Sequence, residues 1–268
     1  MQNKIYGNFN KIFLLLILIS SISYANKYTL VIEPTFPVEQ GLEVYEPLRE
    51  WLSKKTGHDI EIIIDKNYYF YWRSANGSRM PDFTYDAPHV AGFRAEKKRY
   101  IPIATTIEKL SFHLISLDVP GKGKSVEDFL VNKSVVMLPT PSLASIYFSQ
   151  WFSDLFATPN KDVTALSWQE TIEIVFDGSA EAAIVPGWMF DLYPNFASLI
   201  ESEKIPGNTF MASPDLPPEI VELFQNALLS LIEDESAYDV LVELNTEGFK
   251  KPNPEEYKDL VKLLPRVF

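Results

Sequence analysis

Short apolar runs alternate with segments of helical spacing along most of the chain. Between residues 41 and 55, for example, Leu42, Tyr45, Leu48 and Leu52 recur as they would on one face of a helix. Alternation of strand and helix is typical of βαβ units in a parallel sheet. The pattern predicts strands at 28–32, 60–64, near Phe83, 100–104, 134–138, 163–166 and 181–185, and helices at 41–55, 68–74, 91–99, from about 126, 143–156 and 168–176.

One of these strands ends at a polar loop that contains a proline. Phe83 can be buried, but Pro88 lacks an N–H group and disfavours helical backbone at the residue before it, so the strand must end there in a turn. Tyr85, Asp86 and His89 consequently lie at the carboxyl end of a strand. Open α/β sheets bind their ligands at that edge, so this loop is the first candidate for a ligand site.

Two extended stretches, near 106–117 and 205–213, connect one series of strands and helices to the next and back again. Helices predicted at 218–232, 236–244 and 255–264 follow the second stretch. We therefore expect an α/β protein of two lobes, each a mixed, mostly parallel sheet flanked by helices, with two crossover hinge strands between them. The first lobe comprises residues 26–110, the second 111–205, and residues 206–268 return to complete the first.

The first 25 residues follow a different pattern. Lys4 and Lys11 precede the apolar run 12–19, which is too short to span a bilayer, and small residues occupy positions 23 and 25. This arrangement is typical of a signal peptide, and we expect export to the periplasm with cleavage after Ala25. An uncleaved membrane anchor is the alternative, which the polar residues directly after the apolar run disfavour.

Charge and cysteine count exclude several classes of protein. Without the two lysines of residues 1–25, the chain carries 22 basic and 36 acidic residues, a net charge of −14. Such a surface repels nucleic acid and anionic lipid, so we expect no nucleic-acid partner. The chain has no cysteine, and its three histidines, His58, His89 and His113, are far apart in sequence. We therefore predict no metal site and no cofactor.

Five stretches, in order, resemble the phosphonate- and phosphite-binding family of ABC-importer receptors. They are Tyr45–Leu52 with its Tyr-x-Pro-Leu pattern, Asp82–Pro88, Asp177–Ala183, Leu216–Glu219, and Glu247–Phe249 with Tyr257. The resemblance extends from Tyr28 to about Leu264. It implies the two-lobed periplasmic-binding-protein fold, known as a Venus flytrap, in which a monomer without a cofactor closes on a small ligand and delivers it to an inner-membrane permease.

The resemblance also points to ligand-binding positions and to departures from the family. Where the family has a run of hydroxyls at a helix N-terminus, which can hold an oxyanion, this chain has Ser142-Leu143-Ala144-Ser145, with Thr140 close by. Trp168 stands at the position of the family's phosphonate-facing histidine. The ligand is therefore expected to be phosphonate-like or a less charged, flatter organic solute. The predicted ligand-binding residues are Thr35, Phe36, Tyr68, Tyr85, Asp86, His89, Thr140, Ser142, Ser145, Trp168 and Trp188.

Several alternatives remain open at this stage. Trp168 either clamps the ligand or packs on Ile172 in a helix, and Trp188 either faces the ligand or anchors a lobe surface. The same two-lobed protein could report its ligand to a membrane histidine kinase instead of a permease. A hydrolase using Ser142, His89 and Asp86 is the third possibility, although the chain has no Gly-x-Ser-x-Gly motif.

Overall fold

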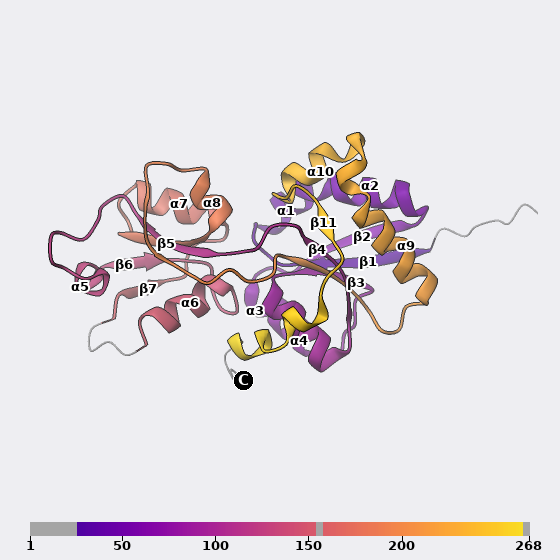
Figure 1. The fold of residues 1–268 in the computed structure, drawn as a ribbon, viewed down its shortest axis with the longest axis horizontal. Coiled ribbons are helices and arrows are strands. Elements are labelled where there is room, and N and C mark those ends of the chain that lie inside the picture. Colours follow the sequence, from indigo (N-terminus) through magenta and orange to yellow (C-terminus); the bar gives the residue numbers. More distant parts are fainter. Residues whose placement is uncertain (1–25, 154–157, 265–268) are drawn as a thin grey trace, which may run out of the picture.

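Two β-sheets organise the chain into two lobes that lie side by side in the computed structural model (Figure 1). The structure describes residues 26–153 and 158–264. The predicted signal peptide, residues 1–25, lies outside the described residues. No helix in the described ranges is both long and apolar enough to cross a lipid bilayer.

The first lobe contains a six-stranded sheet in the order β11-β4-β10-β3-β1-β2. The strands β1, β2 and β3 run parallel, and β10 pairs antiparallel with both β3 and β4. Glu33, which follows β1, and Asp86, which is the last residue of β3, therefore lie together at the carboxyl edge of the sheet. The strands are β1 (Lys27–Ile32), β2 (Asp59–Ile64), β3 (Phe83–Asp86), β4 (Ile101–Thr106), β10 (Thr209–Ala212) and β11 (Phe249–Lys250).

Helices cover both faces of this sheet and bury an aromatic core. Phe83 of β3 stacks on Phe224 with ring centroids 4.0 Å apart, and Tyr28 meets both rings edge-on. The helices are α1 (Val38–Val44), α2 (Glu46–Thr56), α3 (Tyr68–Asn76), α4 (Pro88–Lys98), α9 (Pro218–Leu229) and α10 (Tyr238–Glu243), with 3₁₀ turns η1 (Leu231–Glu233), η2 (Glu235–Ala237), η3 (Pro254–Tyr257) and η4 (Leu260–Leu263).

The second lobe contains a five-stranded sheet in the order β7-β6-β8-β5-β9. Serine side chains at 125, 142 and 167 cap its helices α5, α6 and α7 by accepting a backbone N–H bond, as N-cap serines commonly do. Its elements are β5 (Phe112–Ser116), α5 (Val126–Leu130), β6 (Ser134–Val136), α6 (Leu143–Trp151), β7 (Asn160–Asp162), α7 (Trp168–Phe176), β8 (Ala182–Pro186), α8 (Gly187–Asp191) and β9 (Ala197–Glu201).

Two connections join the lobes. The chain passes from β4 to β5 through residues 107–111 and returns from β9 to β10 through residues 202–208, and a bridge pairs Leu110 with Ile205 between them. The predicted divisions at 110 and 205 fall within these connections. In Figure 1 the connections cross the space between the lobes, with α8 and α10 on one side of them and α4 and α6 on the other.

The structure differs from the sequence-based prediction in several elements. The helix expected at 41–55 is divided at Tyr45, because Pro47 occupies the first turn of α2 and cannot continue α1. The strand expected at 163–166 lies earlier, at β7, and β9 was not predicted. The helix expected at 255–264 is two 3₁₀ turns, separated at Asp259 by a left-handed backbone conformation. The helix expected at 143–156 ends at Trp151, and residues 154–157 lie outside the described ranges.

The sheets are mixed, as predicted, but parallel pairing occupies only one half of each. Four of the nine described strand pairings are parallel and five are antiparallel. The antiparallel pairs involve β10 and β4 in the first lobe and β5 and β9 in the second. The strands β4 and β9 lead into the connections, and β5 and β10 lead out of them. Each sheet therefore contains one strand that points towards the connections and one that points away, and these strands pair antiparallel.

Candidate functional site

A cavity of about 340 Å³ lies between the lobes, against both connections. Tyr85, Leu244 and Asn245 of the first lobe form one wall, and His113 and Trp188 of the second lobe form the opposite wall. Binding pockets for small molecules start at roughly this volume. A solute held here would contact both lobes at once.

Tyr85 supplies a hydroxyl group to the wall of the first lobe. Its ring stacks on Phe210 at 4.3 Å, and the residue is 4% exposed. The hydroxyl makes no hydrogen bond of ordinary geometry among the described residues, and its nearest polar neighbour is the Asn208 side chain, which also lines the cavity. Burial raises the pKa of the Tyr85 hydroxyl, so it remains protonated and can donate. A buried polar group without a partner costs free energy, which a bound ligand would recover.

The second lobe supplies aromatic rings. Trp188 is the second residue of α8, directly after β8, so the end of this strand aims its half-buried indole at the cavity. Phe190 stacks on His113, with ring centroids 4.9 Å apart, and the Nδ1 atom of His113 lies 2.8 Å from Ser198 Oγ. Burial lowers the pKa of the His113 imidazole, so the ring is neutral at neutral pH.

Charged side chains line the cavity only where solvent reaches them. Three acids, Glu108, Asp191 and Glu201, and two lysines, Lys109 and Lys204, belong to its lining, and all five are exposed. The Glu108 carboxylate already accepts bonds from the Thr246 hydroxyl and the Glu247 backbone. The buried surface of the cavity is therefore aromatic and neutral, with mixed charge at its rim.

On the other side of the connections the two lobes touch directly. The His89 Nε2 atom in the first turn of α4 lies 2.7 Å from the Pro141 carbonyl oxygen, which precedes α6. Val31, Tyr68 and Val90 of the first lobe belong to the same buried apolar cluster as the core of the second. We call this contact, from Tyr68 and His89 to Thr140–Ser145, the sealed end of the interface.

The hydroxyl groups of Thr140, Ser142 and Ser145 at the sealed end bind one another and the backbone, whereas the Tyr68 hydroxyl and His89 Nδ1 are buried there without a hydrogen-bond partner among the described residues. Ser142 Oγ donates to the Leu138 carbonyl at 2.6 Å and accepts the Ser145 N–H at 3.2 Å. Ser145 Oγ lies 2.7 Å from Thr140 Oγ1 and accepts a bond from Lys161 Nζ at 2.6 Å. Ser142 and Ser145 are at most 1% exposed.

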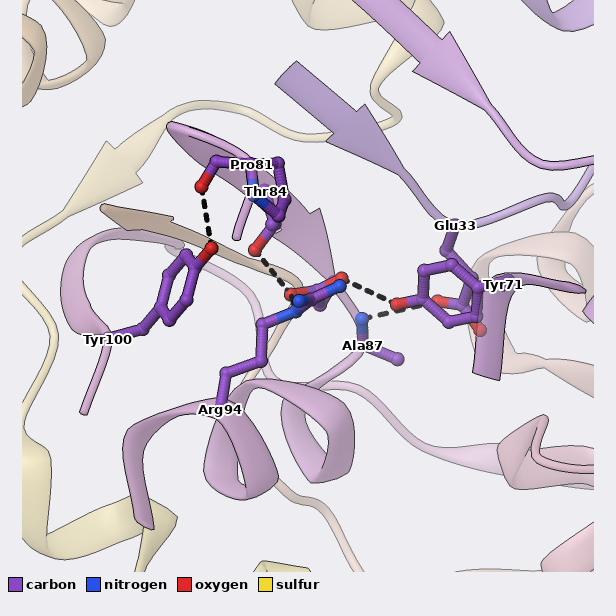
Figure 2. A network of polar contacts seen from close by, with 8 residues as sticks. Glu33, Tyr71, Pro81, Thr84, Ala87, Arg94 and Tyr100 are labelled. Atoms are coloured by element: carbon purple, nitrogen blue, oxygen red, sulfur yellow. Dashed lines mark hydrogen bonds and ion pairs between the residues drawn. The ribbon is translucent and has the colours of Figure 1, made fainter. Parts of the chain in front are cut away.

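Asp86 lies behind the sealed end in a buried network of the first lobe, and Figure 2 labels its partners Tyr71, Thr84 and Arg94. Its carboxylate forms an ion pair with Arg94 Nε at 2.7 Å and accepts bonds from the Tyr71 and Thr84 hydroxyls. Arg94 and Asp86 are almost completely buried. Because the network occupies both carboxylate oxygens, it positions β3 against α3 and α4.

Glu33 is a second buried carboxyl group at this edge of the sheet. It accepts the Ala87 N–H at 3.2 Å, and the ion pairs among the described residues include none to Glu33. Burial raises the pKa of the Glu33 carboxyl to about 7, with the neighbouring Tyr68 hydroxyl acting to lower it and the Asp86 charge acting to raise it. Burial lowers the pKa of His89 to about 4, so its imidazole is neutral.

The structure brings only part of the predicted site together at the cavity. Tyr85 and Trp188 line it, whereas Tyr68, His89, Thr140, Ser142 and Ser145 form the sealed end, and Asp86 belongs to the buried network. Trp168 is 8% exposed and meets Phe112 edge-on at 5.8 Å. Thr35 Oγ1 lies 3.5 Å from the Tyr45 hydroxyl, and Phe36 packs against the same ring.

Sequence reasoning missed His113 and Phe190 as cavity residues. A weak signal for both existed. His113 interrupts an otherwise apolar run in an extended connection, and Phe190 follows a strand end at Pro186-Gly187. The two residues converge because β5 pairs antiparallel with β8, which places His113 opposite Val185. Local sequence pattern does not reveal this pairing.

The suggested triad of Ser142, His89 and Asp86 is not assembled. Among the described residues, each of the three side chains bonds to a different group: the Leu138 carbonyl, the Pro141 carbonyl and Arg94 respectively. A general base must reach the nucleophile it activates. Within the described ranges, no cluster of three His, Cys, Asp or Glu side chains is arranged to hold a metal ion.

Comparisons with known proteins agree with this architecture. The model of a family described as the periplasmic substrate-binding protein of a phosphonate ABC transporter matches residues 30–257. Curated protein sequences give no match.

Among solved structures, PhnD1 from Prochlorococcus marinus in complex with methylphosphonate is 16% identical, with a TM-score of 0.74 over 88% of this chain and 96% of that one. A binding component of a phosphonate transporter from Pseudomonas aeruginosa is 14% identical, with a TM-score of 0.71 over 89% and 85%. A Xanthomonas citri protein bound to ATP is also 14% identical, with a TM-score of 0.65 over 88% and 95%. At these identities the likeness concerns the fold.

Proposed function

This chain belongs to the phosphonate-binding family of periplasmic ABC-transporter substrate-binding proteins, and we propose that it captures its solute in the cavity between the lobes. The observation that carries the proposal is the origin of the cavity walls. Tyr85 comes from the first lobe and Trp188 from the second, and each presents a group suited to a ligand. The protein acts by binding, as a periplasmic monomer, without catalysis.

Capture works by closing the lobes about the two connections. A ligand that contacts both walls binds the closed state better than the open one, and this difference in affinity shifts the population towards closure. The closed protein then presents both lobes to an ABC permease. The acidic surface, with 36 acidic residues in the chain, suits a soluble carrier that does not adhere to anionic lipid.

Closure can be measured directly because the chain contains no cysteine. Glu50→Cys in the first lobe and Lys122→Cys in the second replace exposed residues and accept spin labels. We expect the distance distribution between the labels to shift to one narrow peak when a small-molecule extract of bacterial medium is added. Trp188→Ala in the labelled protein should abolish the shift. An unchanged distribution in the parent protein, across extracts that support growth, would overturn the proposal.

The membrane partner requires a separate measurement. Delivery to a permease predicts that the liganded protein stimulates ATP hydrolysis by its reconstituted partner ABC transporter. Stimulation of a neighbouring histidine kinase without effect on a transporter would instead assign the protein to sensing.

A further inference from the structure

Glu33 is a buried acid that forms no ion pair with any described residue. It follows β1 at the carboxyl edge of the first sheet, where its backbone N–H donates to the Tyr85 carbonyl at 3.3 Å. Its carboxyl accepts the Ala87 N–H (Figure 2), whereas the carboxylate of the neighbouring Asp86 is neutralised by Arg94. Because an unpaired charge is costly to bury, the Glu33 carboxylate lacks a partner that it needs.

Four tyrosines lie around this carboxyl. Burial raises the pKa of each of their hydroxyls, and the charge of the nearby Glu33 adds to the rise at Tyr45, Tyr68, Tyr71 and Tyr85. The Tyr68 hydroxyl lies beside Glu33 but makes no hydrogen bond of ordinary geometry among the described residues, although Tyr68 is only 2% exposed. Carboxylate and hydroxyl oxygens accept hydrogen bonds, so this group is short of a positively charged donor.

The second lobe covers the same group. Val31 and Tyr68 pack in one apolar cluster with the core of the second lobe, and His89 contacts Pro141 next to them. Tyr85 connects the group to the cavity, because it forms part of the cavity wall. A solute therefore reaches Glu33 while the lobes are apart, and closure buries the contact.

We propose that Glu33 and Tyr68 form a subsite for a primary ammonium group of the solute, which the Glu33 carboxylate holds as a buried ion pair when the lobes close. This inference deepens the proposed function and rests on it, since it assumes that a solute binds between the lobes. It assigns one group of the solute and is independent of how an acidic group of the same molecule is held.

The chemistry of the subsite selects a primary ammonium over a quaternary one. A primary ammonium has three N–H donors, which can reach the free lone pairs of the Glu33 carboxylate and of the Tyr68 hydroxyl. A quaternary ammonium has none, so it would leave these buried acceptors unpaired, which is costly. Hydrogen bonds between charged groups are also the stronger ones.

The test compares pairs of probes that differ only in the amine, using titration calorimetry on the purified protein at pH 8. The pairs are 2-aminoethylphosphonate with ethylphosphonate, and alanine with propionate. We expect the amine of at least one pair to bind about tenfold or more tightly than its partner, as hydrogen bonds to charged groups allow. The N-trimethyl derivative of that amine should lose the advantage.

Two variants locate the ammonium group. Glu33→Gln keeps the shape of the side chain and removes its charge, so the advantage of the amine should fall below about threefold. Tyr68→Phe should weaken binding of the amine by roughly three- to tenfold and change that of its partner by less than about twofold. Because Tyr68→Phe breaks no hydrogen bond of the described residues, it tests the subsite even where Glu33→Gln fails to fold.

The pH dependence is a readout that a purely structural Glu33 would not give. The pKa of Glu33, raised by burial to about 7, makes the carboxylate the minor form at pH 6 and the major form at pH 8. Only the carboxylate pairs with an ammonium, so the parent protein should bind the amine about tenfold more weakly at pH 6 than at pH 8. Glu33→Gln should lose this difference, and comparing the two proteins removes the probe's own titration.

Other titratable groups around Glu33 do not produce this dependence. Burial raises the pKa of the four tyrosines and lowers that of His89 to about 4, so none of them changes charge between pH 6 and pH 8. Asp86 is paired with Arg94. Asp65 follows the neighbouring strand β2, and burial raises its pKa as well. Asp65→Asn is therefore the matched control and should keep the pH dependence of the parent.

Three results would overturn the inference: equal affinities of the parent protein for both members of each pair, equal losses of both members in Glu33→Gln, or no binding of either amine. The spin-label distances decide separately whether the lobes close on a solute. The ammonium subsite can thus be rejected while the proposed function stands.

Discussion

The two ends of the interface between the lobes are made of similar residues and differ in how their polar groups are used. At the sealed end, Ser142 and His89 bond to backbone carbonyls of the second lobe. At the cavity, Tyr85 has a buried hydroxyl without a partner among the described residues. The bonded groups of the sealed end contribute to stability, although the Tyr68 hydroxyl and His89 Nδ1 are also buried there without a partner among the described residues. The Tyr85 hydroxyl faces a cavity and is available for binding. Substitutions at the two ends should therefore separate stability from affinity.

The largest effect is expected behind the sealed end, at the buried ion pair. Arg94→Met leaves the Asp86 carboxylate buried without its counter-ion, which typically costs about 3–5 kcal/mol of unfolding free energy. Urea denaturation measures the loss. The matched control is Lys27→Met, which breaks the exposed pair with Glu61 and should cost less than about 1 kcal/mol. Equal losses in the two variants would contradict the assignment of Asp86 to the structure of the lobe.

The two tryptophans predicted to contact the ligand give the next comparison. Trp168→Ala removes an indole that is 8% exposed and packs on Phe112, so we expect a loss of about 3 kcal/mol in the ligand-free protein. Trp188→Ala removes a half-buried indole at the cavity and should cost less than about 1 kcal/mol, while abolishing closure on the solute. Thermal unfolding without ligand separates them. An unchanged melting temperature for Trp168→Ala would return that residue to the ligand site.

Local sequence pattern predicts the site only as far as each strand end. Tyr85 and Trp188 were found because each stands at or beside a strand's carboxyl end, and Ser142 because it precedes a helix. The pattern could not show that Ser142 and His89 would bond across the interface instead of facing a ligand. That depends on how closely the lobes approach each other. The contact between His89 and Pro141 joins residues 52 positions apart in sequence, so local pattern carries no signal for it. His113 was missed for a related reason, since its neighbours come from non-local strand pairing.

The pH dependence of stability should show two opposing groups near the sealed end. Burial raises the pKa of Glu33 from 4.5 to about 7, so its contribution to stability is complete below pH 4.5 and is lost as the pH rises through 7. Burial lowers the pKa of His89 from 6.5 to about 4, so its contribution is complete above pH 6.5 and is lost as the pH falls towards 4. Between pH 7 and pH 5 the two effects nearly cancel.

Removing either group should reveal the other. From pH 7 to pH 5, Glu33→Gln should lose about 2 kcal/mol of unfolding free energy relative to the parent protein, because only His89 then titrates. His89→Gln should gain about 2 kcal/mol over the same range. Urea denaturation at several pH values measures both slopes. Glu39→Gln, at an exposed position of α1, should keep the pH profile of the parent. Identical slopes in all four proteins would mean that neither group is buried in solution.

The smallest effect concerns the caps of two helices, and it tests whether the sealed end is satisfied as described. Ser142→Ala removes the N-cap of α6 together with a bond to the Leu138 carbonyl, and both partners are then left without that hydroxyl in a buried setting. We expect a loss of about 1–2 kcal/mol. Ser125→Ala removes the N-cap of α5 at an exposed position, where water can replace the serine, so about 0.5–1 kcal/mol is expected. A smaller loss at Ser142 than at Ser125 would show that water, and therefore a ligand, reaches the sealed end in solution.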